Sequence, residues 1–595
     1  MIFNTPHKSP LSLRLPLLAM LMAAAAGLLG YAASQDTSEP ETPPEANHDS
    51  AYLRNLQIFT ALTNELENNY VDSIRTDEAF EAAISGMLAT VDPYTEYYSY
   101  KDRERLMKMT TGAYAGIGSY ITTRDGWTYI SNPIAGSPAE KAGLRAGDRI
   151  LRIDSIDAHG KTTEQVSSKL KGAPGTSVKV EIFRPYAADG DSLLTFTIGR
   201  ELVAEPSVPW WGVVDGNTGY IRLTQFVESS ADDVRKALES FKENPEVKNV
   251  VLDLRGNGGG LVDSAIEILG FFLPKGTEVL RTKGKNAADE RTYKTRRTPI
   301  MPDTPLAALI DGGSASASEI VAGALQDPDR AVLIGSRSFG KGLVQGTRPL
   351  PYNTLLKVTT AKYYMPSGRL IQALDYSRKD AEGRVMRTPD SLTHVFKTLH
   401  GREVRDGGGL TPDSVIDWGT YTAVAYGLLA GNHVFDYATK YAATHPKPAS
   451  PGDIRISDAD YEDFVMSVDT ATFKYDHVCL EMLKSLRETS KNEGYLDSAT
   501  AALIDSLQTR LNRELRADLR GRRDEISDYI DEEIAGRYFG EAGRTQRTIC
   551  RDKAMDMAEK IFATPGLYEK ILAAPAAPDK KGKRGETSRQ PKKGK

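Results

Sequence analysis

The first part of the chain spaces its apolar residues as an amphipathic helix does. Between Ala51 and about Met109, hydrophobic side chains recur at helical intervals and polar ones fill the gaps. A turn at Val91-Asp-Pro-Tyr94 interrupts the pattern. The apolar positions are Leu53, Leu56, Phe59, Leu62, Leu66, Phe80, Ile84, Met87 and Leu88. Residues 51–111 are therefore predicted to form a small helical unit.

From Gly112 to about residue 200 the period shortens, and glycine turns separate short alternating runs typical of β-strands. Within this region, Ser137–Asp154 contains a one-turn helix closed by Gly143, then a turn and an apolar strand. The expected strands are Gly116–Thr122, Trp127–Ser131, Arg149–Ile153, Ser177–Phe183 and Leu193–Ile198. Residues 112–200 are predicted to be a separate β-rich domain.

Residues 201–418 alternate apolar strands with amphipathic helices. A buried strand at Lys248–Leu254 leads into the glycine turn Arg255–Gly260, and a helix follows at Leu261–Phe272. The other expected elements are a helix at Ala231–Glu243 and strands at Gly219–Leu223, Leu306–Ile310, Ala331–Ile334, Gly342–Gln345 and Leu355–Thr360. Repeats of strand, turn and helix predict a mostly parallel sheet with its functional residues in the loops.

After Gly419 the pattern is helical again, and residues 419–572 are predicted to be a helical C-terminal domain. Leucines at a spacing of four indicate a stripe that faces a core rather than a docking surface. They are Leu503, Leu507, Leu511, Leu515 and Leu519. Residues 573–595 are rich in Ala and Pro and then in Lys and Arg, which predicts a disordered basic tail.

The composition limits the classes of function. At 595 residues the chain is too long for one core, so about three or four domains are expected. A net charge of −5 argues against a nucleic-acid surface, which needs clustered Lys and Arg. The two cysteines, Cys479 and Cys550, form no disulfide framework and lack zinc-site spacing. They are compatible with one bridge in an oxidising compartment or with two buried free thiols.

The N-terminus has the order of a secretory signal. Lys8 and Arg14 precede an apolar run over residues 15–29, and small residues follow. Because no Ala-x-Ala triplet ends the run, an uncleaved membrane anchor stays open, although the run is short for a full span. Residues 1–34 are thus expected to be a signal peptide or membrane anchor, and the acidic, Pro-rich residues 35–50 a linker. In both cases the body of the protein is expected to be exported.

The stretch Asp311–Leu325 combines small residues with a helical apolar run. A serine that opens such a helix holds its hydroxyl where free N–H groups and the positive end of the helix dipole converge. However, Ser316-Ala-Ser-Glu319 also matches a capping box, with Ser at the N-cap and Glu at N3, which needs no function. From this stretch alone an ordinary helix cap is the better interpretation.

Two glycine-rich loops approach nucleotide-binding motifs without completing them. Gly335–Gly342 nearly matches the phosphate loop, but Gly342 occupies the position of the hydroxyl residue that binds magnesium. In Arg255–Gly260, Leu261 follows where the last glycine of a dinucleotide loop belongs. Nucleotide binding is therefore a weak hypothesis.

Lys341 is a candidate general base. No histidine lies between Gly160 and Thr393, so a Ser-His-Asp site would need one from outside this stretch. A neutral lysine can replace histidine if it is desolvated and lacks a carboxylate partner. If Gly340–Gly346 is a strand, Lys341 and Gln345 share one face, so Gln345 could orient the amine. A solvated lysine at a strand end is the alternative.

Residues 112–200 resemble a PDZ domain. The resemblance rests on Gly116-Ile117-Gly118, the Ser137–Asp154 signature, the Thr163–Lys171 helix and Gly175-Thr-Ser-Val178. It implies binding of another chain's C-terminal end by strand addition, with the terminal carboxylate held by the loop amides of Gly116, Ile117 and Gly118. A PDZ fold kept only as a spacer is the alternative.

Over about residues 55–417 the chain resembles the C-terminal processing, or tail-specific, serine proteases. The shared motifs are Val91–Tyr97, Leu252–Gly260, Ser314–Ile320, Ser338–Gln345, Ala361–Arg369 and Gly409–Asp413, in the family's order. The resemblance implies an α/β multi-domain protein with a helical N-terminal unit and a PDZ domain placed before a ClpP/crotonase-like α/β protease core. A helical C-terminal domain completes the expected architecture, although the family core does not explain that domain.

The same resemblance implies the roles of single residues. The implied triad is Ser316 as nucleophile, Lys341 as general base and Gln345 as the third member. The Ala317 amide would be one oxyanion donor. The other would be Gly259 or Gly260, because the family can carry proline, which has no N–H, at the position of Gly258.

The sequence therefore predicts an exported, periplasmic serine endopeptidase that recognises protein substrates by exposed, apolar C-terminal tails. Its mechanism needs no cofactor and no metal, and no nucleic-acid partner is expected. An uncleaved N-terminal segment would tether it to the inner membrane. The rival interpretation is a non-catalytic PDZ adaptor for protein tails with a vestigial protease fold. The natural substrate and the oligomeric state stay open.

Overall fold

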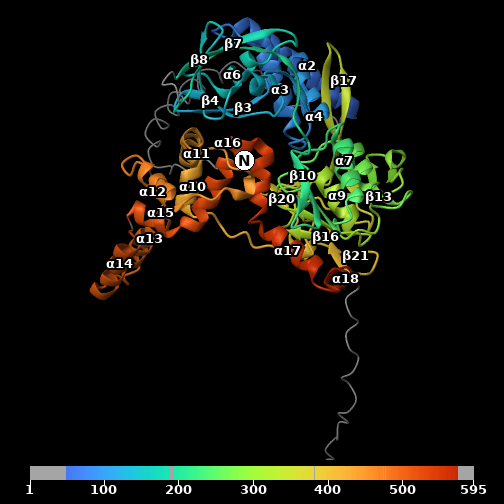
Figure 1. Cartoon of the computed structure of the whole chain (residues 1–595). Helices are drawn as coiled ribbons and strands as arrows, with labels where there is room; N and C mark the ends of the chain where they lie inside the picture. Colours follow the sequence, from blue (N-terminus) through green and yellow to red (C-terminus); the bar gives the residue numbers. More distant parts are fainter. Residues whose placement is uncertain are drawn as a thin grey trace, which may run out of the picture. The chain divides into compact units, whose positions relative to one another are not determined.

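The structure is a computed structural model that describes residues 48–187, 192–380, 382, 384–473, 475, 478–512 and 514–573 (Figure 1). The expected signal or anchor, most of the expected linker and nearly all of the basic tail lie outside these residues. The chain divides into two compact units, residues 1–84 and 85–595. None of the described helices is long and apolar enough to cross a membrane.

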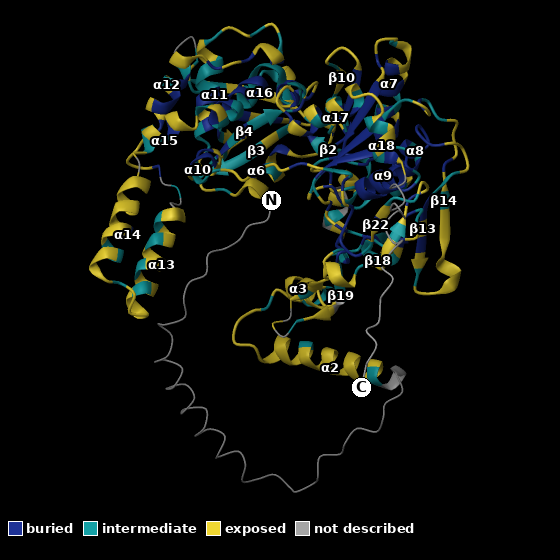
Figure 2. Cartoon of the chain, turned by 90° about the horizontal axis from the view of Figure 1, so that it is seen from below, coloured by how far each residue is buried: buried dark blue, intermediate teal, exposed yellow. Residues whose placement is uncertain are grey.

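The described part of the first unit consists of α2 (His48–Asn69) and most of α3 (Thr76–Leu88), as the helical spacing predicts. Phe59 of α2 meets Phe80 of α3 edge to face, with ring centroids 5.8 Å apart. The rest of the apolar face of α2 is exposed within this unit (Figure 2). It comprises Tyr52, Leu53, Leu56, Ile58, Leu62 and Leu66.

The predicted β-rich domain forms an antiparallel sheet with the strand order β3-β4-β5-β7-β8, to which β6 adds by pairing with β5. Its core packs Ala139 of α5 and Val166 of α6 against strand residues such as Ile150 and Val180. The bounds are β2 (Ala113–Gly116), β3 (Ser119–Arg124), β4 (Trp127–Pro133), α5 (Pro138–Ala142), β5 (Arg149–Ile153), β6 (Ile156–Asp157), α6 (Thr163–Leu170), β7 (Ser177–Phe183), β8 (Leu193–Gly199) and β9 (Glu201–Ala204).

The first expected strand of this domain, Gly116–Thr122, is in fact two strands. β2 ends at Gly116 and pairs with β9, and β3 begins only at Ser119. Gly118 has φ +79°, and a Cβ at this position would lie 2.3 Å from the Cβ of Ser137. The backbone therefore turns between the two strands, and the N–H groups of Ile117 and Gly118 lie outside the β-ladder.

The α/β region is built on a six-stranded sheet with the order β10-β11-β12-β15-β16-β23. β10 is antiparallel to β11, and all the other neighbours are parallel, as the strand–turn–helix repeats predict. The bounds are β10 (Trp210–Val214), β11 (Thr218–Arg222), β12 (Asn249–Asp253), β15 (Leu306–Ile310), β16 (Val332–Gly335) and β23 (Ser414–Val415).

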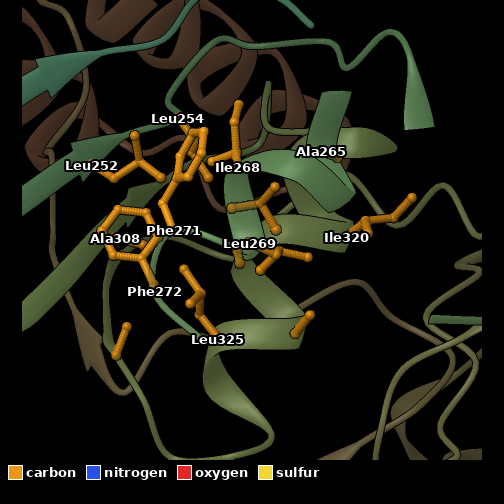
Figure 3. Close-up of a cluster of buried hydrophobic side chains, with 14 of the residues drawn as sticks. Leu252, Leu254, Ala265, Ile268, Leu269, Phe271, Phe272, Ala308, Ile320 and Leu325 are labelled. Atoms are coloured by element: carbon orange, nitrogen blue, oxygen red, sulfur yellow. The ribbon is translucent and has the colours of Figure 1, made fainter. Parts of the chain in front are cut away.

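One face of this sheet packs against α7 (Ser230–Glu243), α8 (Val262–Leu269) and α9 (Ala317–Gln326). Figure 3 shows part of this core, where Leu252 and Ala308 of the sheet lie in one cluster with side chains of α8 and α9. Every residue of α9 is buried. Because the strands of a parallel sheet are apolar on both sides, the other face needs a cover as well.

The last two helices, α17 (Lys553–Ala563) and α18 (Leu567–Leu572), supply this cover and lie beside β16 (Figure 1). Met555 and Ile561 of α17 are almost fully buried in the same cluster as the sheet residues Val251, Leu309 and Ile334. The expected domain boundary at residue 418 therefore does not coincide with a break in packing. The helical region completes the core of the α/β region.

A second sheet joins the α/β region to the segment that precedes the β-rich domain. Its order is β1-β18-β13-β14, and β17 also pairs with β18. Glu96 of β1 lies opposite Lys357 of β18, so residues from about 91 to 98 are brought onto the α/β region. The bounds are β1 (Glu96–Tyr98), β13 (Glu278–Gly284), β14 (Arg291–Lys294), β17 (Leu343–Leu350), β18 (Thr354–Tyr364), and the ribbons β19 (Leu374–Lys379) with β20 (Val385–Arg387) and β21 (Val395–Lys397) with β22 (Glu403–Arg405).

The C-terminal helical region has its own apolar cluster, to which α10, α11, α12, α15 and α16 contribute. α16 bends at Gly540, whose φ of +65° and ψ of −158° are not helical. The helix bounds are α10 (Ala423–Ala430), α11 (His433–Thr444), α12 (Asp458–Ser467), α13 (Val478–Asn492), α14 (Ser498–Leu511), α15 (Leu515–Gly521) and α16 (Arg523–Ile549). Short elements elsewhere are α4 (Arg103–Thr111), η1 (Tyr100–Asp102), η2 (Ala287–Asp289), η3 (Asp390–Leu392) and η4 (Pro451–Asp453).

The leucine stripe of the sequence analysis does not face one core. α14 ends at Leu511 and α15 begins at Leu515, so the leucines are divided between two helices. Leu519 is buried, whereas Leu503 is 68% exposed. α13 and α14 form a hairpin whose surface is mostly exposed (Figure 2). The prediction of a core stripe is wrong for the residues on α14.

Both cysteines differ from the two arrangements expected for them. Cys479 on α13 and Cys550 at the end of α16 are free, so they form no bridge. Both side chains are also exposed rather than buried. The Cys550 thiol donates to the backbone oxygen of Gln546 at 3.3 Å, a contact within one helical turn.

We expect Ile561→Ala to lower the free energy of unfolding by about 2–4 kcal/mol, because it opens a cavity where α17 covers the sheet. Ile561 is 1% exposed. The matched control is Leu503→Ala on exposed α14, which should change stability by less than about 0.5 kcal/mol. Urea titration followed by tryptophan fluorescence measures both. Equal losses in the two variants would contradict the assignment of α17 to the core.

Candidate active site

The structure separates the three serines of the motif that precedes α9. Ser314 and Ser318 are fully buried, and their hydroxyls donate to the carbonyls of Leu254 and Asn257 at 2.9 and 2.8 Å. Ser316 is partly exposed and has a φ of +54° with a ψ of −112°, a strained conformation for a residue with a side chain. Such strain concentrates at functional sites, which favours Ser316 among the three.

The carboxylate of Glu319 connects Ser316 to Lys341. Its Oε2 accepts the N–H of Ser316 at 3.0 Å and the N–H of Lys341 at 2.8 Å. Its Oε1 accepts the N–H of Gly340 at 2.7 Å and the hydroxyl of Ser338 at 2.5 Å. The side chain is fully buried, and burial raises the pKa of Glu319 to about 7 although these donors oppose the rise. The expected capping residue thus also holds the loop that carries Lys341.

These contacts argue against a phosphate-loop role for Gly335–Gly342. In a phosphate loop the backbone N–H groups point at the phosphate, and a helix follows. Here the N–H groups of Gly340 and Lys341 donate to Glu319, and strand β17 follows. Among the described residues, moreover, no group of three or more His, Cys, Asp or Glu side chains could hold a metal ion.

Lys341 lies just ahead of strand β17 rather than within it. The expected strand Gly340–Gly346 begins only at Leu343, and its register with β18 slips between Val344 and Gln345. The backbone before the strand is shaped instead by the bonds to Glu319. The simple alternation that would place Lys341 and Gln345 on one strand face therefore does not apply.

The amine of Lys341 has an environment that favours its neutral form. Burial and, to a smaller extent, the positive charge of Lys357 lower the pKa of Lys341 to about 8, although Asp92, Glu319 and Glu96 oppose the shift. Nζ lies 4.1 Å from the centroid of the Tyr94 ring. Within the described part of the chain, it makes no ion pair and no hydrogen bond, including none with Ser316.

Tyr363 provides a second link between the two candidate catalytic residues. Its buried hydroxyl lies 3.2 Å from the backbone oxygen of Ser316 and also hydrogen-bonds the backbone oxygen of Lys341. Gln345 is not part of this cluster in the structure, because its amide donates to the hydroxyl of Thr359 at 3.3 Å. The triad role of Gln345 stays a prediction.

The glycine turn after β12 packs directly against Ser316. A Cβ on Gly259 would lie 2.8 Å from the Cβ of Ser316 and 3.0 Å from the nitrogen of Ala317. The N–H of Gly259, however, donates to Oδ1 of Asn257 at 2.9 Å. Of the expected oxyanion donors, the N–H groups of Ala317 and Gly260 have no acceptor among the described residues, so they remain available to a ligand.

A buried ion network braces this turn. Asp253 at the end of β12 accepts the Tyr220 hydroxyl at 2.6 Å and pairs with Arg222 at 2.8 Å and Arg255 at 2.5 Å. Burial alone would raise the pKa of Asp253, but Arg255 and Arg222 hold it well below its usual range. Arg255 also pairs with Asp552, just before α17, at 2.5 Å. The C-terminal helices therefore help to fix the turn.

A cavity of about 800 Å³ lies where this network meets α16, and neither Ser316 nor Lys341 lines it. Many of the charged side chains that line this cavity are already paired. Arg255 pairs with Asp552, and Arg544 pairs with Glu541 at 3.5 Å. We therefore interpret it as a polar joint between the α/β region and the helical region, and not as the catalytic cleft.

A smaller pocket of about 170 Å³ lies in the β-rich domain, between β3 and α6. Ile117, Ile121 and Leu170 give it an apolar lining. At its edge, the N–H groups of Ile117 and Gly118 have no acceptor in the described part of the chain. The pocket thus combines an apolar floor with free backbone donors, as a PDZ groove does.

Positive charge lies beside these donors. The ammonium groups of Lys108 and Lys171 are 5.2 and 5.7 Å from the centroid of the Tyr114 ring, and all three residues line the pocket. Lys108 comes from α4, which precedes the β-rich domain, and it also pairs with Glu205 at 3.4 Å. The pocket therefore suits a negatively charged group followed by an apolar one.

Three family models match successive parts of the chain. The model described as "Peptidase family S41" matches residues 217–377, and a PDZ domain model matches residues 129–184. The model described as "Probable PDZ-protease, C-terminal helical domain" matches residues 424–562. The last match accounts for the helical region that the motifs of the protease core left unexplained.

Relatives of known name agree with these models. The carboxy-terminal-processing protease of Bartonella bacilliformis is 36% identical over 331 residues, which cover 55% of this chain and 75% of the relative. The chain belongs to the carboxy-terminal processing proteases of peptidase family S41. The carboxy-terminal processing protease CtpB of Bacillus subtilis is 33% identical over 342 residues, or 56% of this chain and 70% of that one.

Among solved structures, the photosystem II D1 C-terminal processing protease matches 60% of this chain and 86% of its own at 26% identity. Its TM-score of 0.33 is too low to add to the assignment. The sequence identity and the family models alone show that the chain is a serine-type peptidase with a PDZ domain.

The sequence analysis missed several residues of this site. It identified Glu319 only as a capping residue, because the bonds from Gly340 and Lys341 reach Glu319 from another loop, 21 and 22 positions further along the chain. Tyr94 and Tyr363 lie within the quoted motifs, but nothing in their spacing indicates contact with Lys341. Nothing in the sequence indicates that Asp552 pairs with Arg255 of the glycine turn, since the two residues lie 297 positions apart.

We expect Glu319→Gln to lower kcat about 100-fold while the protein stays folded. An amide offers one acceptor oxygen and would turn its own N–H groups toward the donors of Ser316, Gly340 and Lys341, so the catalytic groups lose their alignment. Peptidase assays and thermal unfolding measure the two effects. Glu243→Gln at the exposed end of α7 is the matched control. Full kcat in Glu319→Gln would show that the bridge is dispensable.

Proposed function

We propose that the protein is an exported serine endopeptidase that engages C-terminal tails through its PDZ domain and cleaves upstream with Ser316 and Lys341. The observation that carries this proposal is the shared anchoring of both backbones by Glu319 and Tyr363. The backbone of a strained serine is thereby held by the same groups as the backbone of a lysine whose pKa is lowered and whose amine has no ion-pair partner among the described residues. A Ser–Lys dyad needs this combination.

In the acylation step, the neutral Lys341 amine takes the proton of the Ser316 hydroxyl as Oγ attacks the substrate carbonyl carbon. This requires the lysine side chain to turn from the Tyr94 ring toward Ser316 while both backbones stay held. The N–H of Ala317 and an N–H of the glycine turn, for which Gly260 is the better candidate, receive the negative charge on the carbonyl oxygen.

The remaining steps use the same amine. The Lys341 ammonium returns its proton to the leaving nitrogen as the peptide C–N bond breaks, which leaves an ester on Ser316. The neutral amine then removes a proton from water, whose oxygen attacks the ester carbon. As the ester C–O bond breaks, the Lys341 ammonium returns this proton to Oγ of Ser316, and the second product leaves as a carboxylic acid. In this scheme Gln345 orients the amine, after its amide leaves the hydroxyl of Thr359.

Tail recognition is assigned to the PDZ pocket. The terminal carboxylate would accept the N–H groups of Ile117 and Gly118, close to the charges of Lys108 and Lys171. The last side chain of the tail would enter the apolar part of the pocket, beside Ile117, Ile121 and Leu170. Apolar tails are therefore the proposed substrates.

The location is proposed from sequence alone. The order of basic, apolar and small residues in positions 8–34 supports export to the periplasm. Whether this segment is removed or remains as an inner-membrane tether can be decided by N-terminal sequencing of the protein from cell fractions. A full-length chain in the cytoplasmic fraction would refute export.

Ser316→Ala and Lys341→Ala should each reduce cleavage of an unfolded reporter with an apolar C-terminus by about 10⁴-fold or more, because each removes one half of the dyad. Ser314→Ala is the matched serine control. It removes a buried hydroxyl bond, so it should lower stability but leave the chemistry intact in the folded fraction. Undiminished cleavage by either dyad variant would refute the mechanism. No cleavage by the unaltered protein would favour the adaptor role.

The rate should also rise with pH through about 8, because only the neutral amine of Lys341 can accept the proton and burial lowers its pKa to about 8. Above that pH the rate should reach a plateau. The measurement is the pH dependence of kcat/KM on the same reporter. A flat profile between about pH 6 and 9 would argue against a lysine base.

Full-length Ser316→Ala should bind a peptide with a free apolar C-terminus at least about tenfold more tightly than its C-terminal amide. The amide lacks the charge that the loop N–H groups and the lysines attract. A peptide that ends in Asp should bind as weakly as the amide, because its last side chain would be charged in an apolar pocket. Calorimetric titration measures all three peptides. Equal affinities would refute tail recognition at this pocket.

A further inference from the structure

The Lys341 amine rests against an aromatic ring from a distant part of the chain. Nζ lies 4.1 Å from the centroid of the Tyr94 ring, well within the range of a cation–π contact. Tyr94 precedes the PDZ domain, whereas Lys341 lies in the α/β region. Within the described residues the amine has no hydrogen bond and no ion pair, so apart from the longer-range attraction of Asp92, Glu319 and Glu96 this ring is its one favourable contact.

The position of Tyr94 is fixed from two sides. On its own segment, Asp92 accepts the N–H groups of Tyr94 and Thr95, both at 2.8 Å. Across the site, the hydroxyl of Tyr376 donates to the hydroxyl of Tyr94 at 3.2 Å, and the two rings meet edge to face at 5.9 Å. The ring is therefore a preformed wall of the site.

The segment that carries Tyr94 is also attached to the sheet that follows Lys341. β1 pairs with β18, and the hydroxyl of Thr95 accepts the N–H of Thr359 at 3.3 Å. Thr359 is the residue that receives the amide of Gln345. Tyr94 and Gln345, which would both act on Lys341, are thus connected through Thr359.

A general base must be oriented and must still release its proton easily. A carboxylate beside Lys341 would orient the amine, but it would hold the proton and raise the pKa of the lysine. A ring face attracts the ammonium much more weakly than a carboxylate does, and it also excludes water. An aromatic contact thus positions the amine while it leaves a larger neutral fraction at working pH than a carboxylate would.

We propose that Tyr94 is a positioning residue whose ring face holds the Lys341 amine between turnovers, in place of a hydrogen-bond acceptor. This inference rests on the proposed role of Lys341 as general base. It adds to the active site a residue from outside the protease core, supplied by the segment between the N-terminal helices and the PDZ domain.

The ionisable groups that face Lys341 come from several elements. Asp92 and Glu96 lie on the segment that carries Tyr94 and leads into β1. Glu319 lies on α9, and Lys357 lies on β18. Lys357 is paired with Glu96 at 2.5 Å, and burial raises the pKa values of Tyr94 and Tyr363 above their usual value. Near neutral pH, Glu319, with its raised pKa of about 7, can therefore titrate together with the amine. A readout of the amine itself is needed.

The first experiment compares kcat on the pH plateau for Tyr94→Phe and Tyr94→Leu. Phenylalanine keeps the ring face, so kcat should stay within about twofold of the unaltered protein. Leucine fills similar space without a ring face, so kcat should fall about tenfold while KM changes less than about twofold. Tyr97→Leu, the same change three residues later, is the matched control and should leave both parameters unchanged.

The second experiment measures the pKa of the Lys341 amine directly, by competitive acetylation with mass-spectrometric detection in the full-length Ser316→Ala protein. Tyr94→Leu should lower this pKa by about one unit, because the charged form loses its attraction while the site stays covered. Tyr94→Ala should raise it toward the ordinary 10.5, because water then reaches the amine. Tyr94→Phe should leave it unchanged.

Identical plateau kcat and identical amine pKa in Tyr94→Leu and Tyr94→Phe would overturn the proposal, since the ring would then only fill space. If Tyr94→Leu does not fold, Tyr376→Phe replaces it. That variant removes the hydrogen bond that holds the ring, and an unchanged Lys341 pKa and kcat would overturn the proposal as well. If the dyad itself were wrong, Lys341→Ala would keep full activity. The acetylation measurement does not need catalysis, so it tests the contact between Tyr94 and the Lys341 amine independently of the dyad.

Discussion

The buried carboxylate of Glu319 is the contact on which the rest of the active site depends. One of its oxygens receives the N–H groups of both Ser316 and Lys341, which come from different loops of the α/β region. A carboxylate without water around it is stable only when donors surround it, and here four donors do so. These bonds offset only part of the cost of burying the charge, since the pKa of Glu319 is still raised to about 7, and they also align the two candidate catalytic residues.

This alignment would fail without a firm frame beneath it. Ser316 follows β15, and the glycine turn follows β12, so both lie at the carboxyl ends of neighbouring parallel strands. Such a sheet must be covered on both faces, and the second face is covered by α17 and α18. The same helical region supplies Asp552 to the ion network below the turn. The C-terminal helices thus help to hold the sheet and the turn that carry the candidate active site.

The surroundings of Lys341 suit the role of general base that we propose for it, which histidine has in many serine peptidases. Burial and the nearby Lys357 lower its pKa, while the carboxylates of Asp92, Glu96 and Glu319 keep the shift moderate. A pKa of about 8 leaves a useful neutral fraction near neutral pH and a conjugate acid still able to protonate a leaving amine. The ring of Tyr94 contacts the Lys341 amine without adding a further negative charge, which would raise the pKa of the lysine.

The sequence by itself determined the order of the elements, the parallel sheet and the glycine turn, because periodicity and turn chemistry are local properties. The candidates Ser316 and Lys341 came from the resemblance of their motifs to the C-terminal processing proteases. The sequence could not decide which of three serines is accessible, since burial of Ser314 and Ser318 depends on carbonyls from the neighbouring loop. It misplaced the start of β17 and the leucines of α14, where distant contacts and helix ends override the local pattern. Only the tertiary structure shows that Glu319, Tyr363 and Tyr94 contact Lys341, because contacts between distant residues produce no periodic pattern in the sequence.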